Sequence, residues 1–205
     1  MKHHTDLLLL QARLDAAASA DFVGACEAAA AAWPGAKVGR MAWSAAEGDA
    51  YGYLALPQRA ALEAADLAPV LAAFGQALPA GAAPRVSRLE KQFELPGASA
   101  GAAPAFHYVV EMDPETGWHD ELMRWYDTEH MPGLASVPGA ILATRLFNHD
   151  HGPLSIACYD LVSPDTLGSP PWLAVRASTW SDRVRPHFMH TRRTMFRTLG
   201  DASVT

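Results

Sequence analysis

Trp33-Pro34-Gly35-Ala36 recurs 104 residues later as Val137-Pro138-Gly139-Ala140, and this repeat decides the fold. At the same offset, the hydrophobic run that follows each Pro-Gly-Ala ends in an aromatic residue, Trp43 in the first copy and Phe147 in the second. A period near half the chain length indicates two copies of one domain. The second copy carries a polar and aromatic cluster where the first carries alanines, so a site is expected in the second copy.

The hydrophobic pattern predicts the same order of elements in both copies: strand, helix, strand, strand, helix, strand. Pro34-Gly35 is expected to stop the first helix, Pro132 to end the third near His130, and the serine-rich break at Ser178 to divide the last. The predicted strands lie at 6–12, 37–43, 51–56, 86–95, 105–112, 140–148, 154–161 and 191–199, and the predicted helices at 19–32, 62–74, 118–130 and 170–185.

Pro96–Pro104 is a low-complexity stretch of Pro, Gly, Ala and Ser that is typical of a linker. It divides the chain into a first repeat at 1–95, which would serve as scaffold, the linker at 96–104, and a second repeat at 105–205 with the candidate site. Antiparallel strands with both helices on one face predict an α+β sandwich. The other sheet face of each copy must then be covered, either by the other copy or by a second chain.

Composition excludes several classes of function. The 205 residues are 50% hydrophobic and carry a net charge of -6, without a long basic stripe, so nucleic acid is not an expected partner. No window has the roughly 18 apolar residues needed to span a bilayer, so no membrane partner is expected. Cys26 and Cys158 make no disulfide framework and are expected to be buried, unreactive thiols. These features predict a soluble, cytoplasmic protein.

Arginines crowd the C-terminal part of the chain, against the overall negative charge. Two interpretations remain open, a solvated surface and a cleft that attracts anions. The residues concerned are Arg176, Arg183, Arg185, Arg192, Arg193 and Arg197.

The densest cluster of polar and aromatic side chains lies at 125–132. On a helix Tyr126 and His130 are one turn apart and share a face. If the helix ends at His130, its dipole and the nearby Asp127 favour the protonated imidazole. Such a histidine can give or take a proton near neutral pH, with Tyr126 and Asp127 orienting it. The alternative is a capping histidine that bonds the last carbonyls of the helix.

The pattern Trp125-Tyr126-x-x-x-His130-x-Pro132, followed by Val137-Pro138-Gly139 and a strand with Arg145, resembles the EthD-like and related dimeric α/β-barrel proteins. The resemblance covers the second copy well and the first only by topology and the Pro-Gly-Ala match. It implies two tandem ferredoxin-like (βαββαβ) units whose sheets form a pseudo-dimeric α/β barrel within one chain, with a homodimer as the competing arrangement. It also implies a pocket, but no single chemistry, because members range from cofactor-free monooxygenases, cyclases, decarboxylases and isomerases to haem proteins.

Alternation along the strands of the second copy extends this pocket. We expect His107 and Glu111 on one strand, Arg145 on the next and Tyr159 on the third to project from one largely apolar wall, beside Trp125. These five residues are the predicted substrate-binding set, with Arg145 holding an anionic oxygen. The alternative is that Glu111 and Arg145 form a cross-strand ion pair.

Two other motifs are not expected to be sites. His149-Asp150-His151-Gly152-Pro153 offers potential metal ligands, but all lie in one hairpin turn, so a solvated turn is predicted and no metal. Gly97-Ala98-Ser99-Ala100-Gly101 matches a nucleophile pattern, but no strand–turn–helix context surrounds it. No nucleotide-binding glycine motif is present.

Four hypotheses for function follow. The first is an enzyme that needs no cofactor and performs general acid/base chemistry on a small apolar or anionic organic compound, of monooxygenase, cyclase, decarboxylase or isomerase type. The second is a small-molecule binding protein without catalysis. The third is a haem protein with His130 or His107 as iron ligand. The fourth is a structural role in which the aromatic cluster is only core.

Overall fold

The computed structural model describes residues 1–200, and its contacts divide the chain into two units. Unit 1 comprises Met1–Lys91, Asn148–His151 and the chain from Phe196, whereas unit 2 comprises Gln92–Phe147 and Gly152–Met195. The expected division at 96–104 separates consecutive segments. The observed units instead each include parts of the same two strands, β4 (Arg85–Pro96) and β8 (Phe188–Thr198).

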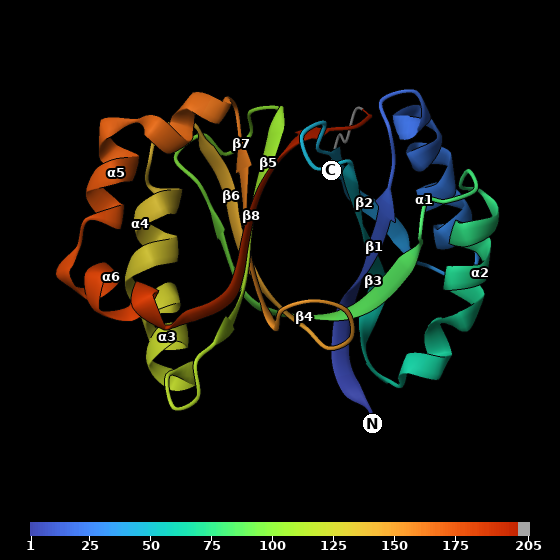
Figure 1. Cartoon of the computed structure of the whole chain (residues 1–205), viewed down its shortest axis with the longest axis horizontal. Coiled ribbons are helices and arrows are strands. Elements are labelled where there is room, and N and C mark those ends of the chain that lie inside the picture. Colours follow the sequence, from blue (N-terminus) through green and yellow to red (C-terminus); the bar gives the residue numbers. More distant parts are fainter. Residues whose placement is uncertain (201–205) are drawn as a thin grey trace. The chain divides into compact units, whose positions relative to one another are not determined.

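Unit 1 is an antiparallel sheet with its helices on one face (Figure 1). The strands hydrogen-bond in the order β4-β1-β3-β2, and the end of β8 pairs with β2. Side chains such as Leu8, Phe22 and Phe74 form the core between sheet and helices. Besides β4 and β8, the elements are β1 (His3–Arg13), η1 (Ala18–Ala20), α1 (Asp21–Ala31), β2 (Lys37–Trp43), β3 (Asp49–Leu62), η2 (Ala64–Leu67) and α2 (Ala68–Gln76).

Unit 2 repeats this plan with more helical segments (Figure 1). Its strands follow the order β8-β5-β7-β6, and the end of β4 lies next to β6. The elements are β5 (Phe106–Pro114), α3 (His119–Trp125), the π-helical η3 (Tyr126–His130), α4 (Met131–Ala135), β6 (Ala140–Asn148), β7 (Ser155–Leu161), η4 (Pro164–Gly168), α5 (Pro170–Arg176), α6 (Thr179–Val184) and η5 (Arg185–His187). Two tandem βαββαβ units, the predicted fold class, are thus confirmed, and their strand connectivity is that of a pseudo-dimeric α/β barrel.

The repeated Pro-Gly-Ala performs the same task in both units. Gly35 has φ +81° and Gly139 has φ +97°, values that favour glycine after the end of a helix. Each turn leads directly into a strand, β2 in unit 1 and β6 in unit 2. The repeat in sequence therefore corresponds to a repeated helix–turn–strand joint.

The stretch at 97–104 is bound to unit 2. The N–H groups of Gly97, Ala98 and Ser99 donate to the carbonyls of Ile141, Ala135 and Ala140, each at 2.8 Å. A Cβ at Gly97 would lie 2.2 Å from the Ala140 oxygen, so only glycine fits there. The segment is a strap over the start of β6, and the hydroxyl of Ser99 accepts a bond from the Gly139 N–H at 2.9 Å.

Two predicted helix starts are wrong. Ser19, which begins the predicted helix 19–32 as its expected cap, does not cap α1, because it lies in η1 and its hydroxyl donates to the Ala16 carbonyl at 2.9 Å. Leu62 ends β3 instead of opening a helix, since Glu63 and Asp66 form a capping box that begins η2. No helix within residues 1–200 combines the length and apolar character that crossing a bilayer requires.

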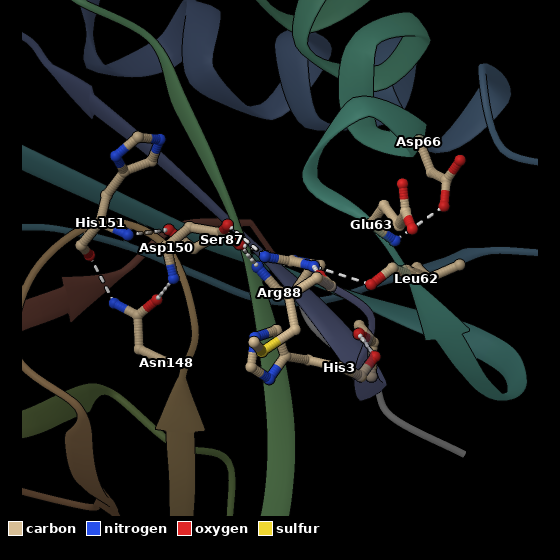
Figure 2. A network of polar contacts seen from close by, with 11 residues as sticks. His3, Leu62, Glu63, Asp66, Ser87, Arg88, Asn148, Asp150 and His151 are labelled. Carbon is tan, nitrogen blue, oxygen red and sulfur yellow. Dashed lines mark hydrogen bonds and ion pairs between the residues drawn. The ribbon is translucent and has the colours of Figure 1, made fainter.

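The turn at His149–His151 is not the solvated turn that its composition predicts. The carboxylate of Asp150 accepts hydrogen bonds from the backbone N–H of Arg88 at 2.8 Å and from its Nε and Nη2 at 3.0 and 2.7 Å. Nη1 of Arg88 donates to the Leu62 carbonyl at 2.7 Å, and the Arg88 side chain is almost fully buried (Figure 2). The turn is therefore bound to strand β4 of unit 1 through Asp150 and Arg88.

The histidines of this turn also have neighbours. The ring of His149 stacks on that of His3, with centroids 4.2 Å apart, and Nε2 of His149 lies 3.4 Å from Oε2 of Glu90. Within residues 1–200, no three His, Cys, Asp or Glu side chains gather as they would around a metal ion.

Candidate functional site

The helix that carries the aromatic cluster does not end at His130, as the sequence suggested. It widens into the π-helical turn η3 and continues as α4, with Pro132 in the first turn of α4. The N–H of Met131 bonds to the carbonyl of Tyr126, five residues back. Proline is tolerated at the start of a helix because its missing N–H is not needed there, so the wide turn lets the chain pass Pro132 without a break.

The π turn decides which rings meet. In a regular α-helix, residues five apart point in different directions, because each residue turns about 100°. In η3 they lie on one side, and the ring of His130 stacks on Trp125 with centroids 4.1 Å apart and planes inclined by 22°. Tyr126 meets the same imidazole edge-on at 5.7 Å. π turns of this kind occur often at functional sites.

His130 is buried and kept neutral. The residue is 9% exposed, and its Nδ1 has no hydrogen-bond partner within residues 1–200. Burial, followed by the positive charges of Arg185 and Arg176, lowers the pKa of His130 to about 3. The expectation that a helix end would favour the protonated form is therefore wrong, because the helix continues and the nearby charges are positive.

A narrow cavity lies beside His130, entirely within unit 2. It offers about 30 Å³ for the centres of water-sized molecules. The wall is mostly aromatic, and no carboxylate is part of it. The lining residues are Tyr108, Val110, Trp125, Tyr126, His130, Leu134, Tyr159, Trp172, Arg176, Arg185, Phe188 and Arg193.

Two buried tyrosines of the predicted set line this cavity. Burial raises the pKa of Tyr126 and of Tyr159, so both hydroxyls stay protonated at neutral pH. The Tyr159 hydroxyl donates to Sδ of Met131 at 3.0 Å, and its ring meets Trp172 edge-on at 5.3 Å. With Trp125 and His130, four of the eight predicted site residues surround one space.

Asp127 and Arg145 pair with each other. Nη2 of Arg145 lies 2.7 and 2.8 Å from the two carboxylate oxygens of Asp127, and Nε lies 3.0 Å from Oδ1. Nη1 of Arg145 also contacts Sδ of Met123 at 2.9 Å. Neither residue lines the cavity, so Asp127 does not orient His130 and Arg145 does not face a ligand there.

Glu129, near the C-terminal end of η3, is held by hydrogen bonds from Trp125 and Ser178. Oε1 of Glu129 accepts a bond from Trp125 Nε1 at 3.2 Å and a short one from the Ser178 hydroxyl. Ser178 also caps α6, where its hydroxyl accepts from the Ser181 N–H. The predicted division of the last helix at Ser178 is confirmed.

His107 and Glu111 lie on the opposite face of the sheet, which corrects the predicted wall. Directly paired residues of adjacent strands point to one side, and β5 pairs Tyr108 with Tyr159 and His107 with Asp160. Nδ1 of His107 is 2.8 Å from Oδ1 of Asp160 in a buried pair. Glu111 is therefore also on the face away from Arg145, and the proposed Glu111–Arg145 pair cannot form.

The sequence interpretation missed several members of the wall. Tyr108 had a usable signal, because it alternates with His107 and its face follows from the register of β5 and β7. Trp172 and Phe188 come from segments that follow the cluster by about forty residues or more, and no short-range pattern connects them to it. Three of the six crowded arginines, Arg176, Arg185 and Arg193, also belong to the wall.

Comparison with known proteins defines the class of fold. No protein-family model matches the chain, and no curated protein matches it. Among solved structures, it is similar to an anthrone oxidase-like protein at 14% identity and TM-score 0.63, over 96% of this chain and 92% of that one. It is also similar to a proposed monooxygenase from Lactobacillus acidophilus NCFM (11% identity, TM-score 0.62, 95% and 94% covered).

A third similar structure is a chlorite dismutase from Candidatus Nitrospira defluvii (12% identity, TM-score 0.58, 96% and 92% covered). At these identities the likeness is one of fold. The comparison therefore shows the arrangement of strands and helices alone and does not single out EthD-like proteins.

Proposed function

We propose that this chain is a small-molecule enzyme of monooxygenase type that needs no cofactor and uses His130 as its proton acceptor. The observation that carries the proposal is a buried, neutral imidazole that lines an aromatic cavity and whose Nδ1 has no hydrogen-bond partner within residues 1–200. Unsatisfied buried polar groups are rare and call for an explanation, and a substrate proton is one. The described activities of two structural neighbours, an oxidase-like protein and a proposed monooxygenase, support this choice.

Proton transfer in this cavity depends on the neighbouring charges. A pKa near 3 makes His130 a weak base when the cavity is empty. The anion that forms on the substrate, however, would lie beside Arg176 and Arg185, which stabilise it and offset the cost of a buried imidazolium. Tyr126 and Trp125 position His130 through their ring contacts.

The oxygen chemistry balances without another reductant. Loss of a proton from a CH2 carbon leaves a carbanion that can give electrons to O2. The overall reaction R2CH2 + O2 → R2CO + H2O then consumes one O2 per substrate. Most of the wall is aromatic, and apolar side chains that keep water from a site protect such an intermediate.

A haem protein fits these residues poorly. The cavity beside His130 is far smaller than a macrocycle, and the imidazole is stacked against Trp125 with Tyr126 at its edge. His107, the other proposed ligand, has its Nδ1 paired with Asp160 on the opposite face. No step of the proposed reaction involves haem.

The test measures O2 uptake and product mass with a panel of hydroxylated single-ring aromatics that carry an activated CH2 group. We expect turnover by the wild type and a loss of about 10²–10⁴-fold in His130→Gln, in which the base is removed. His119→Gln, at an exposed position outside the cavity, is the matched control. Full activity of His130→Gln would remove His130 from the reaction. Ligand binding without O2 uptake would identify a binding protein instead of an enzyme.

A further inference from the structure

Three arginines reach the cavity from three different elements. Arg176 ends α5, Arg185 begins η5 and Arg193 lies on β8. Within residues 1–200 none of the three guanidinium groups forms an ion pair. Arg183 on the same stretch of chain, by contrast, pairs with Glu121, so unpaired arginines are not a general property of this segment.

The three charges act on one another. Burial and the charges of Arg176 and Arg193 lower the pKa of Arg185. Asp182 offsets this repulsion only in part, and within residues 1–200 no carboxylate side chain lines the cavity. A bound anion would remove it, and convergent guanidinium groups bind planar oxyanions well.

The remainder of the wall selects the shape of the ligand. Tyr108, Trp125, Tyr126, Trp172 and Phe188 present ring faces and edges, and the space between them is narrow. Such a space admits one planar ring more readily than an aliphatic body. The buried imidazole of His130, whose Nδ1 has no partner within residues 1–200, belongs to the same wall.

We propose that the ligand of this cavity is a monocyclic aromatic anion, whose carboxylate or similar group is held by Arg176, Arg185 and Arg193 while its ring lies among the aromatic side chains. This deepens the proposed function and rests on it only for the claim that the ligand is a substrate.

Calorimetric titration at neutral pH and low salt tests whether the cavity binds anions in preference to a neutral ring. The probes are benzoate, 2-hydroxybenzoate and phenyl phosphate, with benzamide as the neutral match for benzoate. We expect at least one anion to bind, and benzoate to bind about tenfold or more tightly than benzamide. Failure of all three anions to bind, or equal binding of benzoate and benzamide, overturns the proposal.

Variants test the arginines. Arg185→Gln should weaken binding of the anions by about tenfold or more and leave benzamide unchanged. Arg183→Gln is the matched control, because it removes the same charge from the same segment outside the cavity and should leave binding unchanged. An equal loss in both variants would indicate a general surface field and overturn the proposal. Circular dichroism of each variant verifies that it is folded.

Cyclohexanecarboxylate and acetate test the ring. Both carry the charge without an aromatic face, and we expect each to bind more weakly than benzoate. Equal binding would overturn the aromatic part of the proposal. Because binding is measured without turnover, arginine-dependent binding with no O2 uptake would count against the proposed enzyme alone. Turnover of neutral substrates, together with failure of all three anionic probes to bind, would count against the anionic ligand alone.

Discussion

Cys26 in unit 1 and His130 in unit 2 stand at the same place in the repeat, 104 residues apart, and their surroundings differ. Around Cys26 the helix is a regular α1, and a Cβ at Gly52 would lie 2.6 Å from Sγ. Burial raises the pKa of the Cys26 thiol to about 12, so it remains an unreactive thiol. Around His130 a π turn and large rings leave a cavity. One scaffold thus yields a closed core or a pocket, depending on side-chain size and on one widened helical turn.

Each unit also contains a buried arginine that is paired with an aspartate. Removing either arginine is expected to have the largest effect on stability. Arg88 is 4% exposed and bonds both Asp150 and the Leu62 carbonyl. Removing one partner of such a buried pair costs about 3–5 kcal/mol, so Arg88→Leu should lower the free energy of unfolding by that amount. Arg145→Leu should cost less, about 1–3 kcal/mol, because the Asp127 side chain is 38% exposed and water can replace its partner.

Urea unfolding followed by circular dichroism measures both losses. Arg59→Leu is the control, since Arg59 lies at the surface beside Asp6 and Glu90 and should change stability by about 1 kcal/mol or less. A loss for Arg145→Leu as large as that for Arg88→Leu would contradict the difference in solvent access between the two pairs.

Much of the fold could be predicted, because the turns that end its helices and begin its strands are specified by local sequence. The bounds of β2 and β6 agree with the predicted strands 37–43 and 140–148, since a Pro-Gly turn precedes each. The site was harder, because the helical pattern assumes 3.6 residues per turn. That assumption pairs His130 with Tyr126 correctly, but it cannot place His130 on Trp125, which requires the π turn.

The wall of the pocket shows a second limit of prediction from sequence. A strand alternates with period two, so choosing His107 instead of Tyr108 as the inward residue reverses the whole face. Only the register between β5 and β7, a long-range property, decides between them. The cavity arginines were recognised as a crowd, but the distinction between Arg183 with its partner and Arg185 without one depends on tertiary contacts.

The tight packing around Cys26 predicts the next effect in size. Gly52→Ala places a Cβ against Sγ of Cys26 and should destabilise the protein by about 1–3 kcal/mol in urea unfolding. In a Cys26→Ala background the same change should cost much less, because the obstructing sulfur is absent. Gly24 lies in α1, the helix that carries Cys26, and no atom lies within 4 Å of a Cβ added there. Gly24→Ala should therefore stabilise the protein by about 0.5–1 kcal/mol. Equal costs of Gly52→Ala in the two backgrounds would show that Cys26 does not close this part of unit 1.

His130 is also expected to contribute to the dependence of stability on pH. Its pKa is about 3 in the folded chain against an ordinary value of 6.5, so between these values the unfolded chain binds a proton that the folded chain does not. Stability should therefore fall as the pH decreases from 6.5 toward 3, by at most about 1.4 kcal/mol per pH unit from this one group. His149 adds to the slope in the same direction, since burial lowers its pKa as well.

His130→Gln isolates the contribution of His130, because His149 is present in both proteins. The variant should show a shallower slope of unfolding free energy against pH in this range, whereas Cys26→Ala, at the matching position of unit 1, should keep the wild-type slope. Since Arg185 and Arg176 contribute to the low pKa of His130, Arg185→Gln should raise that pKa and narrow the pH range over which His130 lowers stability. Identical slopes in the wild type and His130→Gln would mean that His130 is solvated. The claim that unit 2 buries a neutral imidazole beside a pocket, whereas unit 1 has a closed core, would then be wrong.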